Sequence, residues 1–146
     1  MSLTIFQLLD LKKGFSLPLW VAGAAKSAFK ILLGSSFQNY ELIKIPNENR
    51  QVKIEVDSAA FIQGNSHAMG ITYAKSDLAL DLTQNLEIWT IASLEKSVIK
   101  NITQKNQINI IAGYGVGIDQ KTSEICISLF AKEVLYENLL DIIPDG

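Results

Sequence analysis

The chain has 146 residues, with 13 basic and 15 acidic side chains, a net charge of −2 and no block of like charge. This balance gives no electrostatic reason to expect binding to nucleic acid or to a membrane surface. The length suits a single domain, 1–146, that buries about two thirds of its unfolded surface and needs no metal or disulfide to hold it.

The chain has a single cysteine and a single histidine, which bear on two further classes of site: disulfides and metal sites. Cys126 has no partner for an internal disulfide, which fits a reducing compartment, and its apolar surroundings are typical of core packing. His67 has no Cys, Asp or Glu at metal-ligand spacing, so we expect no protein-bound metal. The apolar stretch 17–25 is too short to cross a bilayer and follows no basic leader with a cleavage site. We therefore expect a cytoplasmic protein.

The first long element is a helix over 16–33. Its apolar residues recur at steps of three and four until Gly34 offers a left-handed stop. The run 22–25 (Ala-Gly-Ala-Ala) is unusually small and permits close approach to a sheet. Lys26 and Lys30, one turn apart, are predicted to lie on the solvated side.

Apolar alternation dominates the middle of the chain, and a second amphipathic stripe over 130–143 predicts a helix near its end. Residues 3–9 predict a docking strand or turn at the edge of the fold, and 93–105 a polar helix or excursion. The predicted strands are 40–45, 51–56, 67–74, 86–91, 107–112 and 124–130.

Two helices at opposite ends of the chain, with hairpin-like strands between them, predict an α+β fold. We expect two layers: a mixed or antiparallel sheet that includes 51–56, 86–91 and 107–112, with the helices mainly on one face. A doubly wound parallel sheet would need a helix after nearly every strand.

Three glycines at alternate positions, Gly113, Gly115 and Gly117, follow the strand 107–112. Glycine accepts positive φ and lets a ligand approach bare backbone, so the pattern fits a ligand cradle as well as a structural turn. In dinucleotide folds such glycines open directly into a helix, whereas a strand-like run, 124–128, intervenes here. No Walker lysine follows at the spacing that a phosphate loop requires.

The connection 75–85 carries polar side chains between two predicted strands. Lys75, Asp81, Thr83 and Asn85 lie in it, where a loop would bind a ligand. Asp81 and Thr83 are equally suited to capping a turn.

Three segments in this order resemble the cobalt-precorrin-5B (C-1)-methyltransferase family, CbiD, of anaerobic cobalamin biosynthesis. They are 14–28 (Gly-Phe-Ser-Leu-Pro and the small-residue helix), 75–88 (the lysine, Asp81-Leu-Thr83 and the strand entry) and 113–117 (Gly-Tyr-Gly-Val-Gly). Two departures are notable. Leu78-Ala-Leu80 replaces a fuller acidic run, and 118–121 replaces the family's continuation after the glycines.

The resemblance implies transfer of a methyl group from S-adenosyl-L-methionine to C-1 of cobalt-precorrin-5B, a cobalt corrinoid, giving cobalt-precorrin-6A. The expected cofactor-binding residues are Gly113, Gly115, Gly117, Asp81, Thr83 and Asn85. Lys75 and Lys121 border the two loops and are expected to bind the carboxylates of the substrate. No catalytic residue is singled out, because methyl transfer from a sulfonium needs positioning more than a strong base.

The resemblance covers only the amino-terminal part of the family's length. The alternative function is therefore a non-catalytic fragment or binding module that retains the fold only. We expect no useful turnover by the chain alone, and an exposed apolar patch near the carboxy-terminal helix would favour a homo-oligomer.

Overall fold

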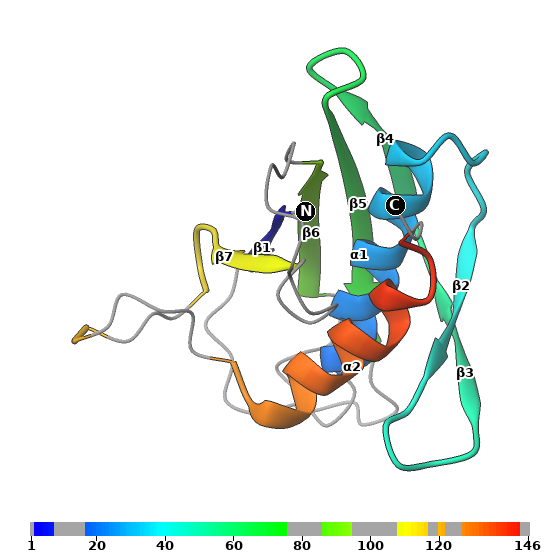
Figure 1. Ribbon diagram of the computed structural model, residues 1–146, viewed down its shortest axis with the longest axis vertical. Helices are drawn as coiled ribbons and strands as arrows, with labels where there is room; N and C mark the ends of the chain where they lie inside the picture. The colour runs from blue at the N-terminus through cyan, green and yellow to red at the C-terminus, as the bar shows by residue number, and fades with distance from the viewer. Residues whose placement is uncertain are drawn as a thin grey trace, which may run out of the picture.

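The computed structural model describes residues 2–7 (only the backbone of 6 and 7), 17–75, 86–94, 108–116, 120–121 and 127–143. A mixed five-stranded sheet has the order β4-β5-β6-β1-β7, and a separate two-stranded sheet pairs β2 with β3 (Figure 1). The large sheet contains β1 (Ser2–Gln7), β4 (Ser58–Ile62), β5 (His67–Ala74), β6 (Leu86–Ser93) and β7 (Asn109–Ala112); the small sheet contains β2 (Tyr40–Lys44) and β3 (Gln51–Glu55). The expected α+β fold with a mixed sheet is confirmed.

Helix α1 (Leu17–Leu32) packs on β5 and β6 at unusually short range. A Cβ built on Gly70 of β5 would lie 2.1 Å from the carbonyl oxygen of Ala24 in α1. The close approach predicted from the run 22–25 is therefore confirmed. The hydroxyl of Thr72 donates to the carbonyl oxygen of Trp20 at 2.9 Å, so α1 runs antiparallel to β5.

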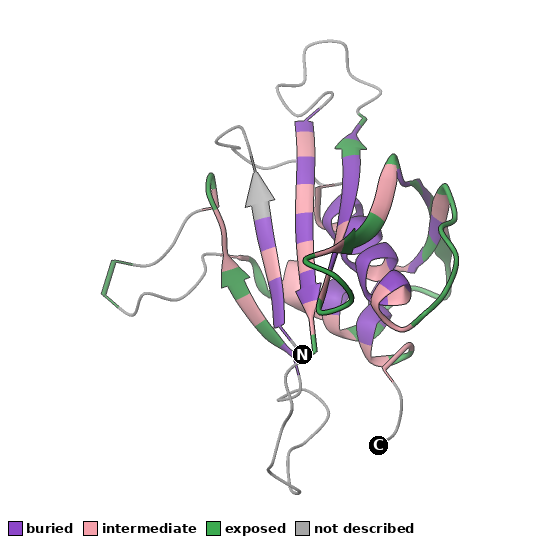
Figure 2. Ribbon diagram, turned by 90° about the horizontal axis from the view of Figure 1, so that it is seen from above, coloured by how far each residue is buried: buried purple, intermediate pink, exposed green. Residues whose placement is uncertain are grey.

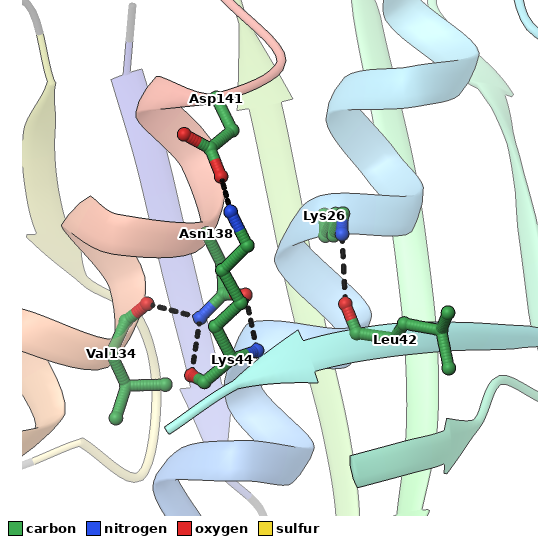
Figure 3. A network of polar contacts seen from close by, with 6 residues as sticks. All are labelled: Lys26, Leu42, Lys44, Val134, Asn138 and Asp141. Carbon is green, nitrogen blue, oxygen red and sulfur yellow. Dashed lines mark hydrogen bonds and ion pairs between the residues drawn. The ribbon is translucent and has the colours of Figure 1, made fainter. Parts of the chain in front are cut away.

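Helix α2 (Leu129–Leu140) packs mainly on α1 and on β2. Both helices lie on the same side of the five-stranded sheet, as expected (Figures 1 and 3). The alternating bands along β6 show which residues face them: Leu86, Ile88, Thr90 and Ala92 are buried (Figure 2). No helix in the described ranges is long and apolar enough to cross a membrane.

Two strand predictions were wrong in their placement. Segment 51–56 does not join the large sheet, because β3 pairs along its length with β2. The described part of segment 3–9, residues 3–7, is not at an edge, since β1 lies between β6 and β7, where Leu3 and Ile5 are buried. An alternating pattern identifies a strand, but it does not identify the strand's neighbours.

The predicted strand 124–130 is wrong where it is described. Ser128 is the N-cap of α2, its hydroxyl accepting a hydrogen bond from the backbone N–H of Ala131 at 3.1 Å. Residues 129 and 130 are therefore helical. A serine ahead of an apolar run was the available signal. Residues 122–126, and most of 93–105, lie outside the described residues.

The prediction that Lys26 and Lys30 of α1 lie on the solvated side was wrong. Lys30 forms an ion pair of 2.8 Å with Glu41 of β2, whose side chain is only 3% exposed. Half-buried Lys26 donates to the carbonyl oxygen of Leu42 at 2.8 Å, and burial is the main cause of its lowered pKa. Strand β2 covers this side of the helix, a tertiary contact that the helical period does not encode.

A buried amide attaches α2 to the same strand (Figure 3). The side-chain oxygen of Asn138 accepts from the backbone N–H of Lys44 at 2.7 Å, and its nitrogen donates to the carbonyl oxygens of Lys44 (3.0 Å) and Val134 (2.8 Å). The ammonium of Lys44 also pairs with Asp141. Side chains from both helices thus satisfy backbone groups along the outer edge of β2, where no other strand of the described ranges pairs with it.

Candidate functional site

The sheet topology brings the ends of β1, β5 and β7 to one place. Ala74, the last residue of β5, pairs with Leu86, the first of β6, while Gln7 of β1 pairs with Ile88. Ala112, the last residue of β7, is level with Ile5. We call this end of the five-stranded sheet the site end. Lys75 and Gly113, from two motifs far apart in sequence, both leave the sheet there.

Helix α1 also begins at the site end. Its first turn lies beside the end of β5, because the carbonyl oxygen of Trp20 accepts from Thr72. The N–H groups in the first turn of a helix have no partner within the helix, although Pro18 contributes none here, and the macrodipole makes this terminus positive. The site end therefore has a favourable field for anions.

The glycine segment forms a closed β-turn. The N–H of Gly113 donates to the carbonyl oxygen of Ile5 at 2.7 Å, and the N–H of Val116 donates back to Gly113 at 3.3 Å. Gly115 occupies the third position with φ of 82°, the conformation that a type II turn requires of this residue. Tyr114 at the tip is 79% exposed. The positive φ makes glycine structurally necessary at 115, whereas the hydrogen bonds of Gly113 are backbone bonds that any residue except proline could make. The described residues offer no backbone acceptor to the N–H groups of Tyr114 and Gly115.

A cavity of about 470 Å³ lies beside Lys75, between the end of β5 and the two-stranded sheet. It is lined by Asn39, Tyr40, Lys53, Glu55, Val56, Asp57, Tyr73 and Lys75. The ammonium of Lys75 pairs with the carboxylate of Glu55, and that of Lys53 lies 4.5 Å from the ring centroid of Tyr40. Sequence reasoning missed this cavity because the polar alternation of β3 is that of any solvated strand face.

Charged side chains of both signs surround the cavity. The hydrogen bond from Lys75 and the charges of Lys75 and Lys53 lower the pKa of Glu55. The charge of Glu87, partial burial and the charge of Asp57 raise the pKa of Tyr73. The cations thus act on Glu55, and the carboxylates act on Tyr73.

Comparison with known proteins identifies the family of the chain. The model of the CbiD family matches residues 7–146. The chain belongs to the CbiD family. It is 70% identical, over 136 residues, to a protein of Prochlorococcus marinus strain MIT 9215 named cobalt-precorrin-5B C(1)-methyltransferase.

More distant CbiD proteins carry the same name. The chain is 69% identical over 136 residues to the protein of strain MIT 9312 and 34% identical over 137 residues to that of strain NATL2A. These matches cover 93%, 93% and 90% of the chain but only 37%, 37% and 36% of the relatives. The chain thus spans a little over a third of the length of these CbiD relatives. No solved structure matches it.

The structure describes only some of the remaining residues that were predicted for the site. Asp81, Thr83, Asn85 and Gly117 lie outside the described residues, while Lys121 is described and exposed. His67 opens β5 at the opposite end of the sheet, and its ring lies 2.8 Å from the hydroxyl of Ser66. The described residues contain no group of three or more His, Cys, Asp or Glu that could hold a metal ion.

Proposed function

We propose that this chain belongs to a cytoplasmic enzyme that transfers a methyl group from S-adenosyl-L-methionine to C-1 of cobalt-precorrin-5B, giving cobalt-precorrin-6A in cobalamin biosynthesis. The observation that carries the proposal is identity of up to 70% over 93% of the chain with proteins named for this reaction. The convergence of the glycine turn, Lys75 and the start of α1 at the site end supports it. We also infer that the chain forms one domain, which is supported by the core that β1, α1, β6 and α2 share among the described residues. Its one cysteine suits a reducing compartment.

The reaction depends mainly on how the methyl donor and the accepting ring carbon are positioned. A ring carbon of the substrate attacks the methyl carbon of the sulfonium, so the new carbon–carbon bond forms as the sulfur–carbon bond breaks and its electron pair returns to sulfur. The products are the methylated corrinoid and S-adenosylhomocysteine. The barrier falls when donor and acceptor are held in line and close together, so the reaction does not require a catalytic triad.

The residues of the site end suit the two ligands. Backbone N–H groups of the turn at Tyr114 and Gly115, with Gly113, Gly117, Asp81, Thr83 and Asn85, would hold the adenosyl and amino-acid parts of the donor. Lys75 and Lys121 would hold carboxylates of the corrinoid. Lys75 and Gly113 follow strands that are separated by β6 and β1, so they stand about 14 Å apart at ordinary strand spacing. That separation leaves room for a wide macrocycle beside its methyl donor.

A second candidate function is binding without turnover. It is favoured by Leu78-Ala-Leu80, which replaces a fuller acidic run in the motif that resembles the family, because a site without those carboxylates could still bind its ligands but position them less well. The two candidates differ in turnover and agree in binding.

Calorimetry with three ligands tests the proposal: S-adenosyl-L-methionine, ATP, and dicyanocobyrinic acid as a stable cobalt corrinoid with free carboxylates. We expect binding of the first and third but not of ATP. Transfer of a labelled methyl group to cobalt-precorrin-5B then separates an enzyme from a binding module. Failure to bind both the donor and the corrinoid would refute both candidates.

A further inference from the structure

The cavity beside Lys75 contains a second lysine that no sequence motif indicated. Lys53 lies on the exposed face of β3, with its ammonium over the ring of Tyr40. Within the described ranges this ammonium has no carboxylate within ion-pair distance and makes no hydrogen bond. An ammonium has three donors and no acceptor. Lys53 therefore offers a charge and three N–H groups to the cavity, all available to a ligand.

Glu55 shows what kind of ligand these two lysines stabilise. Its carboxylate pairs with Lys75 and also feels the charge of Lys53, and both interactions lower its pKa. The two lysines thus already stabilise one carboxylate that belongs to the protein. Lys75 uses one of its donors on Glu55, so Lys53 is the stronger remaining attraction for a second carboxylate.

The neutral lining residues favour the same class of ligand. Asn39 and Tyr40 also line the cavity, with the ring of Tyr40 against Lys53, and they carry amide and phenol donors. Asp57, which also lines the cavity, and Glu87 carry the negative charges that raise the pKa of Tyr73, and these carboxylates repel an anion near Tyr73. An entering carboxylate is therefore directed to the Lys53 side of the cavity.

We infer that this cavity binds a carboxylate side arm of the corrinoid substrate, with Lys53 as its main contact and Glu55 as an internal competitor for Lys75. The inference rests on the proposed function, because that function supplies the polycarboxylate. The volume, about 470 Å³, lies toward the lower end for small-molecule sites. It accommodates the edge of a macrocycle with its side arms, while the ring remains over the site end.

Equilibrium dialysis with two corrinoids tests the inference. Dicyanocobyrinic acid has free carboxylates, whereas in dicyanocobinamide these arms are amides on the same ring. Lys53→Gln should weaken binding of the acid about fivefold, the upper range for an exposed ion pair, and leave cobinamide binding unchanged. Glu55→Gln should strengthen binding of the acid, because it frees Lys75 and removes a like charge. Lys132→Gln on α2 changes the net charge as Lys53→Gln does, and it should leave both affinities unchanged.

The contrary outcomes are distinct. If wild-type protein binds the acid, but Lys53→Gln and Glu55→Gln leave that affinity unchanged or shift it as Lys132→Gln does, the inference is wrong and the proposed function stands. If wild-type protein binds neither the corrinoids nor S-adenosyl-L-methionine, both fall. The difference between the two corrinoids should also shrink as salt rises from 0.05 to 0.5 M, roughly from a 14 Å to a 4 Å screening length. A difference that does not change with salt would contradict recognition by charge.

Discussion

Asn138 should be among the most sensitive polar positions in the fold. Its side chain is buried, at 1% exposure, and makes two hydrogen bonds to the backbone of Lys44, 94 residues away in sequence. Asn138→Ala removes both and the local bond to Val134. Each net bond contributes about 1 kcal/mol, and a backbone group left without a partner adds to the loss. We expect the free energy of unfolding to fall by about 2.5 kcal/mol.

Urea denaturation followed by tryptophan fluorescence measures this loss, with Trp20 and Trp89 as probes. For 146 residues the same loss lowers Tm by roughly 8 °C. Glu137→Ala, one residue away on the exposed side of α2, is the matched control and should change stability by less than about 0.5 kcal/mol. Amide hydrogen exchange should also accelerate in β2 more than in β6. A loss below about 1 kcal/mol with unchanged exchange in β2 would refute the idea that this amide attaches the two-stranded sheet to the helices.

Three further substitutions test other parts of the account. Gly70→Ala places a Cβ 2.1 Å from the carbonyl oxygen of Ala24, so α1 must move, and urea denaturation should show a loss of at least about 3 kcal/mol; a loss like that of an exposed alanine substitution would contradict the packing. Lys26→Met removes a group whose pKa is lowered by burial. Because the folded protein releases this proton first, wild-type stability relative to the variant should rise as pH increases from that lowered pKa toward 10.5; urea midpoints that show a constant or falling difference would refute it. Gly115→Val should weaken S-adenosyl-L-methionine binding at least tenfold, about 1.4 kcal/mol, in calorimetry, whereas Gly64→Val, another positive-φ glycine at the opposite end of the sheet, should not; equal affinities in folded variants would leave the glycine turn a purely structural role.

Local patterns predicted much of the secondary structure because they depend on neighbours in sequence. The period of three to four residues located α1 and most of α2, and alternation located β2, β3, β5, β6 and β7. The small residues of α1 even predicted its close approach to the sheet, which Gly70 completes from the other side.

Long-range partners could not be predicted in the same way. Strand β3 alternates as a sheet strand does, yet whether it joins β2 alone or the large sheet depends on packing elsewhere. Nothing local in β1 distinguishes a central strand from an edge strand. The hydrogen bonds between Asn138 and Lys44 join residues that are 94 apart in sequence. A helical pattern on its own predicts only on which face of the helix such an asparagine lies.

The candidate site was likewise predictable only in part: its motif residues could be identified from the sequence, but their arrangement in space could not. The motifs identified Lys75 and Gly113, while only the register of β1, β5, β6 and β7 places them at one end of the sheet. Lys53 had no distinguishing motif, because its role arises from the fold of β3 against the end of β5. The charged residues of a strand indicate a ligand site only when the other residues that line the same cavity are known.

The central claim is that ligands bind at the site end of the five-stranded sheet. Titration of isotopically labelled protein with S-adenosyl-L-methionine, followed by amide NMR shifts, tests it most directly. The account predicts the largest shifts at Lys75, Leu86, Gly113 and Tyr114, and small ones at Gly64 and His67 at the far end. Shifts concentrated at Gly64 and His67, or no shifts at a saturating concentration of the ligand, would contradict it.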